Sequence, residues 1–208
     1  MRLFGCKFLL AGTLALCVAT PAYALTLGQL VGGMPFSTGS LTFDHFQATA
    51  AGSADPTFDD YAVQVLEDGF RISGPVSAMR GQAGTLLLSY DVTSTGPGIT
   101  GASLYSSGIA VRGSQALVAE SLSESENVLV GTLVVYDVAC VGRVPLASAS
   151  FGPVSELLVA ETLQVKSGAF AAVPFVDQRF VPAPEPMTLF LLGSGILGLF
   201  LTGRRNRG

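Results

Sequence analysis

The feature that most constrains the fold is a period-two alternation of side chains in the middle of the chain. Between Leu86 and Thr93, large apolar residues occupy every second position, and Val128–Val138 repeats this spacing. Successive side chains of a β-strand point to opposite faces, so both segments are predicted to be strands. In Val128–Val138 the intervening positions are also largely apolar, which predicts a central strand buried on both faces.

Further segments of strand character are separated by turn-forming pairs such as Asp68-Gly69 and Gly152-Pro153. We expect strands at Ser40–Gln47, Tyr61–Leu66, Phe70–Ser73, Ala102–Ser106, Ile109–Arg112, Leu146–Phe151, Glu156–Val165 and Asp177–Val181. Ala116–Leu122 is compatible with either a short helix or a strand. About nine or ten short strands without helix–strand alternation predict an all-β fold, an antiparallel β-sandwich that is jelly-roll-like or related.

Composition and charge exclude several classes of protein for this middle region, residues 25–180. The stretch from Leu25 to Ala183 carries 14 acidic and 6 basic residues, a net charge of −8, and the chain has no Trp. An acidic domain without a basic groove repels phosphate backbones, so we expect no nucleic-acid partner. The scarcity of charge and the single internal cysteine also argue against a coiled coil and a disulfide-stapled mini-protein.

Residues 1–24 have the organisation of a cleavable signal peptide. Arg2 and Lys7 precede an apolar run of about twelve residues, too short to span a bilayer, and Ala22 and Ala24 provide the small-x-small cleavage pattern. We expect cleavage after Ala24. The alternatives are a buried first helix or lipidation of Cys17, which is disfavoured because the bulky Leu16 precedes it.

Residues 181–208 have three parts in a fixed order. A proline-rich arm containing Pro184, Glu185 and Pro186 is followed by an apolar run, residues 187–203, and then by Arg204, Arg205 and Arg207. Proline at alternate positions keeps the arm extended and non-helical. Seventeen helical residues rise about 25 Å, slightly less than the hydrocarbon core. Arginines favour the cytoplasmic side, which would leave the middle domain in the periplasm.

This arrangement resembles the PEP-CTERM protein-sorting signal of Gram-negative bacteria. The resemblance covers residues 181–208 and implies a temporary anchor that exosortase, a membrane-embedded cysteine protease, recognises and cuts near Pro184–Pro186. It implies a precursor in the inner membrane with a cytoplasmic C-terminus, and a mature form at the cell surface or outside the cell. The implied partners are signal peptidase, exosortase and the exopolysaccharide that such organisms often make. A permanent C-terminal anchor is the alternative.

Candidate catalytic and metal-binding residues are few. His45 is the only histidine, and we interpret it as a surface or structural residue. The acids between Asp55 and Asp68 form a solvated loop in our interpretation, with Asp55, Asp59 and Asp60 as a weak Ca²⁺ candidate because their spacing is not that of an EF-hand. Cys140, alone after signal cleavage, is expected to be a buried small hydrophobe.

We therefore expect a non-enzymatic exported protein, a structural component of the cell surface or extracellular matrix, without a metal or other cofactor. Two other classes stay open. One is a carbohydrate- or Ca²⁺-binding module using the acidic loop. The other is a hydrolase around Asp44 and His45, which fails if His45 faces solvent with no acid or hydroxyl partner beyond Asp44.

Overall fold

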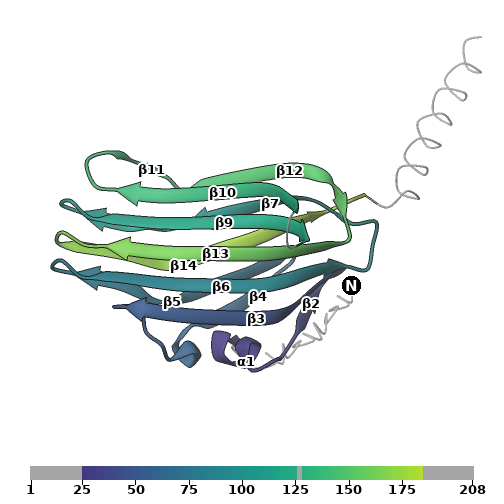
Figure 1. Cartoon of the computed structure of the whole chain (residues 1–208), viewed down its shortest axis with the longest axis horizontal. Coiled ribbons are helices and arrows are strands. Elements are labelled where there is room, and N and C mark those ends of the chain that lie inside the picture. Colours follow the sequence, from purple (N-terminus) through teal and green to yellow (C-terminus); the bar gives the residue numbers. More distant parts are fainter. Residues whose placement is uncertain (1–24, 126–127, 185–208) are drawn as a thin grey trace, which may run out of the picture.

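The structure, a computed structural model, describes residues 25–125 and 128–184. Two antiparallel seven-stranded sheets pack face to face as a β-sandwich (Figure 1), which confirms the expected all-β class. The signal segment, residues 1–24, and the apolar run, residues 187–203, lie outside the described residues. Within the described part of the chain, no helix is long and apolar enough to cross a membrane.

Sheet A is the layer that carries the last strand of the domain. Its strands, in spatial order, are β1 (Leu25–Thr26), β4 (Ala62–Leu66), β5 (Gly69–Met79), β14 (Phe170–Pro182), β7 (Ile99–Ser106) and β12 (Leu146–Val154), and β8 (Ile109–Val111) also pairs with β14. Strand β14 continues through Pro182, so the first two residues of the proline-rich arm belong to this sheet.

Sheet B is the layer that carries the candidate site. Its strands, in spatial order, are β11 (Gly142–Val144), β10 (Val128–Val138), β9 (Gln115–Ser125), β13 (Glu156–Lys166), β6 (Ala83–Ser94), β3 (Leu41–Gly52) and β2 (Phe36–Thr38). The segment Ala116–Leu122, which the sequence left undecided, is strand, as part of β9.

Two short helical segments, which the sequence analysis missed, close one side of the sandwich. They are α1 (Leu27–Val31) and the 3-10 helix η1 (Phe58–Asp60). Helix α1 begins with a capping box, in which the Thr26 hydroxyl accepts from Gln29 N and the Gln29 side chain accepts from Thr26 N. It buries Leu27 and Leu30 against the core.

Two of our expectations are wrong. Strand β10 is not central: it lies second from the edge of sheet B, and Val134 is 42% exposed because this sheet's outer face has no described layer over it. Only its inward residues, such as Leu133 and Val135, are buried. Cys140 is exposed because it lies in the turn between β10 and β11, with a φ of 66°.

The core is organised around packed aromatic rings from both sheets. Tyr90 on β6 stacks on Phe46 and meets Phe70 of sheet A edge to face, with ring centroids 5.0 and 5.2 Å away. Phe43 and Phe180 complete the cluster. Offset-stacked and edge-to-face contacts of this kind favour aromatic packing beyond the area that it buries.

Two carboxyl groups are buried in this core beside Tyr90. Glu120 and Glu161 are direct cross-strand partners on β9 and β13, each 2% exposed, and none of their four oxygens has a hydrogen-bond partner. Burial raises the pKa of Glu120 to about 8. Burial, and then the charge of Glu120, raises the pKa of Glu161 well above its ordinary range. Both carboxyls are therefore protonated in the folded protein under mildly acidic conditions.

We expect the domain to lose stability as the pH rises from about 4.5 toward 8. In that window the folded state binds more protons than the unfolded state, so raising the pH favours unfolding. Replacing Glu161 by Gln removes one of these titrations. At pH 8 the change should raise the unfolding temperature by about 5 °C, equivalent to roughly 2 kcal/mol in a domain of this size.

Thermal unfolding monitored by circular dichroism from pH 4 to 9 measures this effect. Glu124→Gln, at an exposed position of β9, is the control and should leave the profile unchanged. Equal pH profiles for wild type and Glu161→Gln would contradict the buried-carboxyl account.

Candidate functional site

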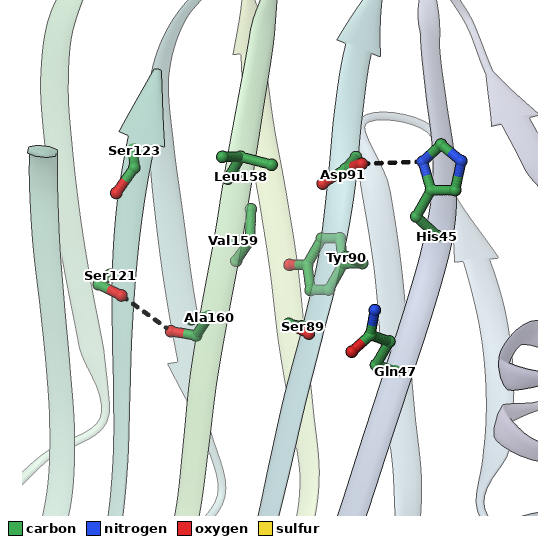
Figure 2. Close-up of a pocket in the computed structure, with 10 residues that line it drawn as sticks. All are labelled: His45, Gln47, Ser89, Tyr90, Asp91, Ser121, Ser123, Leu158, Val159 and Ala160. Carbon is green, nitrogen blue, oxygen red and sulfur yellow. Dashed lines mark hydrogen bonds and ion pairs between the residues drawn. The ribbon is translucent and has the colours of Figure 1, made fainter. Parts of the chain in front are cut away.

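A polar depression on the outer face of sheet B has a volume of about 490 Å³. We refer to it as the sheet B trough. It crosses four neighbouring strands, β3, β6, β13 and β9 (Figure 2). The residues that line it are His45, Gln47, Ser89, Tyr90, Asp91, Ser121, Ser123, Leu158, Val159 and Ala160. Tyr90 and Val159 are almost fully buried, so their side chains belong to the core.

Strand register explains why this surface is hollow. One row across the sheet runs from Gln47 to Ser89, Ala160 and Ser121, each the direct cross-strand partner of the one before. Three small side chains in succession leave space that larger outward residues would fill. No aromatic ring points into the trough from its floor, so a ligand would be held by hydrogen bonds rather than by ring stacking.

A β-bulge shapes the β3 end of the trough. Asp44 pairs with Asp91 and Gln47 pairs with Ser89, so β3 has one residue more than β6 between these pairs. The insertion keeps both Phe43 and Phe46 buried in the core. His45 adopts a φ of 53° there, in the left-handed region that non-glycine residues rarely enter.

The bulge brings the only histidine to two carboxylates. His45 Nδ1 lies 2.8 Å from Asp91 Oδ2, a hydrogen bond drawn in Figure 2, and 3.4 Å from Asp44 Oδ1. The hydrogen bond to Asp91, followed by the charges of Asp44 and Asp91, raises the pKa of His45 above its ordinary value of 6.5. The imidazole itself is exposed, as expected for a surface histidine.

This cluster bears on the hydrolase hypothesis. The condition that would have excluded it is not met, because Asp91 is a second acid partner of His45. Even so, within the described chain no hydroxyl hydrogen-bonds to the imidazole, and a Ser-His-Asp arrangement requires a nucleophile there. Sequence reasoning missed Asp91. The alternation in Leu86–Thr93 does predict that Asp91 points away from the core. It does not predict that Asp91 pairs with Asp44 on β3.

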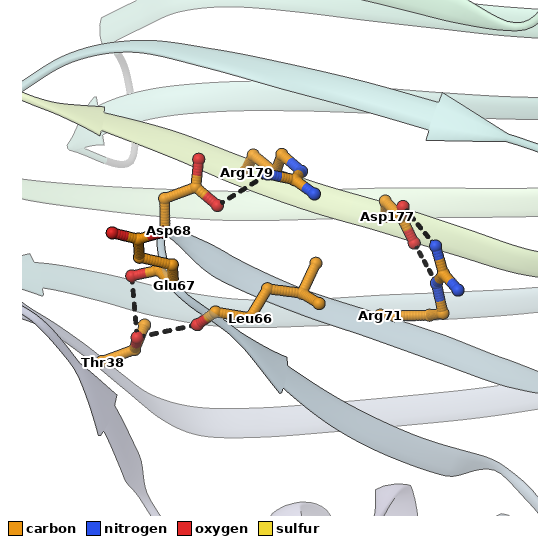
Figure 3. A network of polar contacts seen from close by, with 7 residues as sticks. All are labelled: Thr38, Leu66, Glu67, Asp68, Arg71, Asp177 and Arg179. Atoms are coloured by element: carbon orange, nitrogen blue, oxygen red, sulfur yellow. Dashed lines mark hydrogen bonds and ion pairs between the residues drawn. The ribbon is translucent and has the colours of Figure 1, made fainter.

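The acidic loop is dispersed in the structure. Asp55 accepts a hydrogen bond from Thr57 N, Asp59 accepts one from the Thr26 hydroxyl, and Asp68 pairs with Arg179 (Figure 3). Among the described residues, the acids and histidine whose ligand atoms lie within 4.8 Å of one another are Asp44, His45 and Asp91. Asp55, Asp59 and Asp60 do not form such a group.

On the outer face of sheet A, a salt bridge occupies the corresponding central position. The Arg71 guanidinium donates to both carboxylate oxygens of Asp177 (Figure 3), with Nη2 at 2.8 Å from Oδ2. It also lies 4.2 Å from the centroid of the Phe175 ring. Asp177 is 6% exposed, so both charges are already satisfied within the protein. This pair therefore stabilises the sheet rather than offering free ligands.

The residues of the predicted sorting signals lie mostly beyond the described chain. Pro184 is described and is exposed. Glu185, Pro186, the arginines Arg204, Arg205 and Arg207, and the cleavage residues Ala22 and Ala24 lie outside the described residues.

Fold and site together define an antiparallel β-sandwich with a polar trough across one outer face. No family model matches the chain, and no curated protein matches it. One solved structure with a similar arrangement is described as TmCBM61 in complex with β-1,4-galactotriose. The two are 10% identical, with a TM-score of 0.39 over 67% of this chain and 89% of that one. The galactotriose is a ligand of that protein.

Proposed function

We propose that this chain is a non-enzymatic exported β-sandwich, made as an inner-membrane precursor and released by an exosortase-like protease. The proposal rests mainly on the position along the chain at which the described residues stop being buried in the core. Phe180 is the last fully buried side chain of β14, and Val181, Pro182 and Pro184 are exposed. Among the described residues, a cut near Pro184–Pro186 would leave every buried side chain with the domain.

The path of the chain out of the domain supports access by a protease. Ala183 N donates to Gly98 O at 2.7 Å, and within residues 25–184 this is the hydrogen bond nearest the C-terminal end that ties the arm to the sandwich. Proteases bind their substrates as extended chains, and prolines at 182, 184 and 186 keep this segment out of a helix. Signal peptidase would remove residues 1–24, and the released domain would remain at the cell surface or in the extracellular matrix.

Two finer features belong to the same proposal. The chain crosses repeatedly between the layers, from β3 in sheet B to β4 and β5 in sheet A, then to β6 in sheet B and to β7 in sheet A, which supports a jelly-roll-like sandwich. The tail would act as a temporary anchor through residues 187–203, with Arg204, Arg205 and Arg207 on the cytoplasmic side.

Replacing Pro184, Glu185 and Pro186 together by Ala should block release from the membrane. The apolar run, residues 187–203, and the arginine cluster are unchanged, so the precursor should still insert. It should then stay full length in the inner-membrane fraction, whereas the wild type appears outside the cell. Fractionation and immunoblotting in the native host measure the distribution.

The matched control replaces three exposed prolines of the domain, Pro56, Pro97 and Pro153, by Ala. This variant should be released like the wild type. Equal release of the triple-alanine tail variant and the wild type would overturn the sorting proposal.

A second candidate function is recognition of a polysaccharide by the sheet B trough. It is favoured by the lining, in which Ser89, Ser121, Ser123 and the Gln47 amide offer hydrogen-bond donors and acceptors to a neutral polyhydroxylated chain. An open trough across the outer face of four antiparallel strands suits a linear polymer more than a compact ligand, because it leaves both ends of the ligand free.

Filling the trough tests this candidate. Ala160→Gln should weaken retention of the protein in an affinity gel containing host exopolysaccharide by roughly fivefold, the effect of losing about 1 kcal/mol. Ala119→Gln, an outward position of β9 beyond the trough, is the control and should not change retention. Unchanged retention in Ala160→Gln, or no retention of the wild type, would exclude the trough as a polysaccharide site.

A further inference from the structure

We propose that Asp44, His45 and Asp91 form a binding site for a divalent transition-metal ion of the Zn²⁺ type, at the β3 end of the sheet B trough. The site would use Asp44 Oδ1, His45 Nδ1 and Asp91 Oδ2 as ligands. This inference does not depend on the export of the protein, and it differs from the Ca²⁺ candidate that the acidic loop suggested.

The distances between the ligand atoms fit a common ion. His45 Nδ1 lies 2.8 Å from Asp91 Oδ2 and 3.4 Å from Asp44 Oδ1, and all three atoms lie within 4.8 Å of one another. Ligands about 2.1 Å from a metal ion are separated by roughly 3.0 Å at right angles and roughly 3.4 Å at tetrahedral angles. Small side-chain rotations would therefore bring all three atoms onto one ion.

The charges of the cluster favour a cation independently of these distances. Asp44 and Asp91 are direct cross-strand partners on the same face of sheet B, and like charges in that relation destabilise a sheet. In addition, Asp44 Oδ1 is shielded from solvent and has no hydrogen-bond partner. An unsatisfied carboxylate oxygen is costly. A bound divalent ion would satisfy this oxygen and screen the repulsion between the two aspartates.

The backbone holds the third ligand in place. His45 is the extra residue of the bulge, and its left-handed conformation directs the ring across to Asp91 on the neighbouring strand (Figure 2). Bulges often re-aim a side chain in this way at functional positions. Without the bulge, residue 45 would follow the alternation of β3 and point into the core.

The ligand set selects the class of metal. One imidazole and two carboxylates suit Zn²⁺, Co²⁺ or Ni²⁺, whereas Ca²⁺ takes six to eight oxygen ligands. Three protein ligands leave at least one coordination position open. That position would face the trough and solvent, since the His45 side chain is 74% exposed. A water molecule or a hydroxyl of a ligand in the trough could occupy it.

Isothermal titration calorimetry with ZnCl₂ tests the proposal. The protein is the full-length chain, purified in detergent without a histidine tag and carrying Cys6→Ser, Cys17→Ser and Cys140→Ser, which together remove all three thiols of the chain as competing ligands. We expect one equivalent of Zn²⁺ to bind. His45→Asn, chosen because Asn tolerates a positive φ, and Asp91→Asn should each weaken binding at least about tenfold, or about 1.4 kcal/mol.

Two controls make the result specific. Asp59→Asn makes the same change of charge outside the cluster and should keep the wild-type affinity. Thermal unfolding of each variant in EDTA checks that the fold is intact. If a folded His45→Asn or Asp91→Asn variant binds Zn²⁺ as tightly as the parent, or if the parent takes up no Zn²⁺ at millimolar concentration, the proposal is wrong. Tighter binding of Ca²⁺ than of Zn²⁺ would also overturn it.

Discussion

The position of Tyr90 is the constraint on which the rest of the structure depends. Its ring packs against aromatic rings of both sheets, and its hydroxyl donates to Gln178 Oε1 of sheet A at 2.9 Å. A buried phenol needs such a partner, so this hydrogen bond fixes how the two sheets face each other. Because side chains alternate along a strand, burying Tyr90 forces Ser89 and Asp91 onto the outer face. The candidate site is therefore a consequence of the core.

The same region of the core contains buried carboxyl groups without hydrogen-bond partners, which lower the stability of the fold. Glu120 and Glu161 lie opposite each other on β9 and β13. Burial raises the pKa of both carboxyls, so both are protonated under mildly acidic conditions. Gln178 faces them and partly offsets the rise of both pKa values. The apolar residues and rings around this group must supply the stability that these carboxyls remove. The two buried carboxyls therefore make the stability of the fold depend on pH.

Sequence reasoning predicted the strands well because period-two alternation depends on local geometry alone. It identified β3, β6, β10 and β13 and the class of fold, and it left most of β9 undecided between strand and helix. It misjudged β10, because apolar residues on both faces do not reveal whether a second layer covers each face. Helix α1 could have been found, since Thr26 and Gln29 have the spacing of a capping box.

The Asp44–His45–Asp91 cluster depends on the register between β3 and β6, which the bulge sets and no local pattern encodes. The sequence offers one sign of that bulge. Phe43 and Phe46 are three residues apart, whereas two core residues of a regular strand are separated by an even number of positions.

In the described part of the chain the core ends at Phe180, and the residues from 181 onward resemble a sorting signal, so the central claim is that this tail is removed. The most direct test is the intact mass of the protein recovered from its native host, with sequencing of both ends. The account predicts a mature chain that begins at Leu25 and ends near Pro184–Pro186. A mature chain that still ends in Arg207-Gly208 would contradict it and would identify residues 187–203 as a permanent anchor.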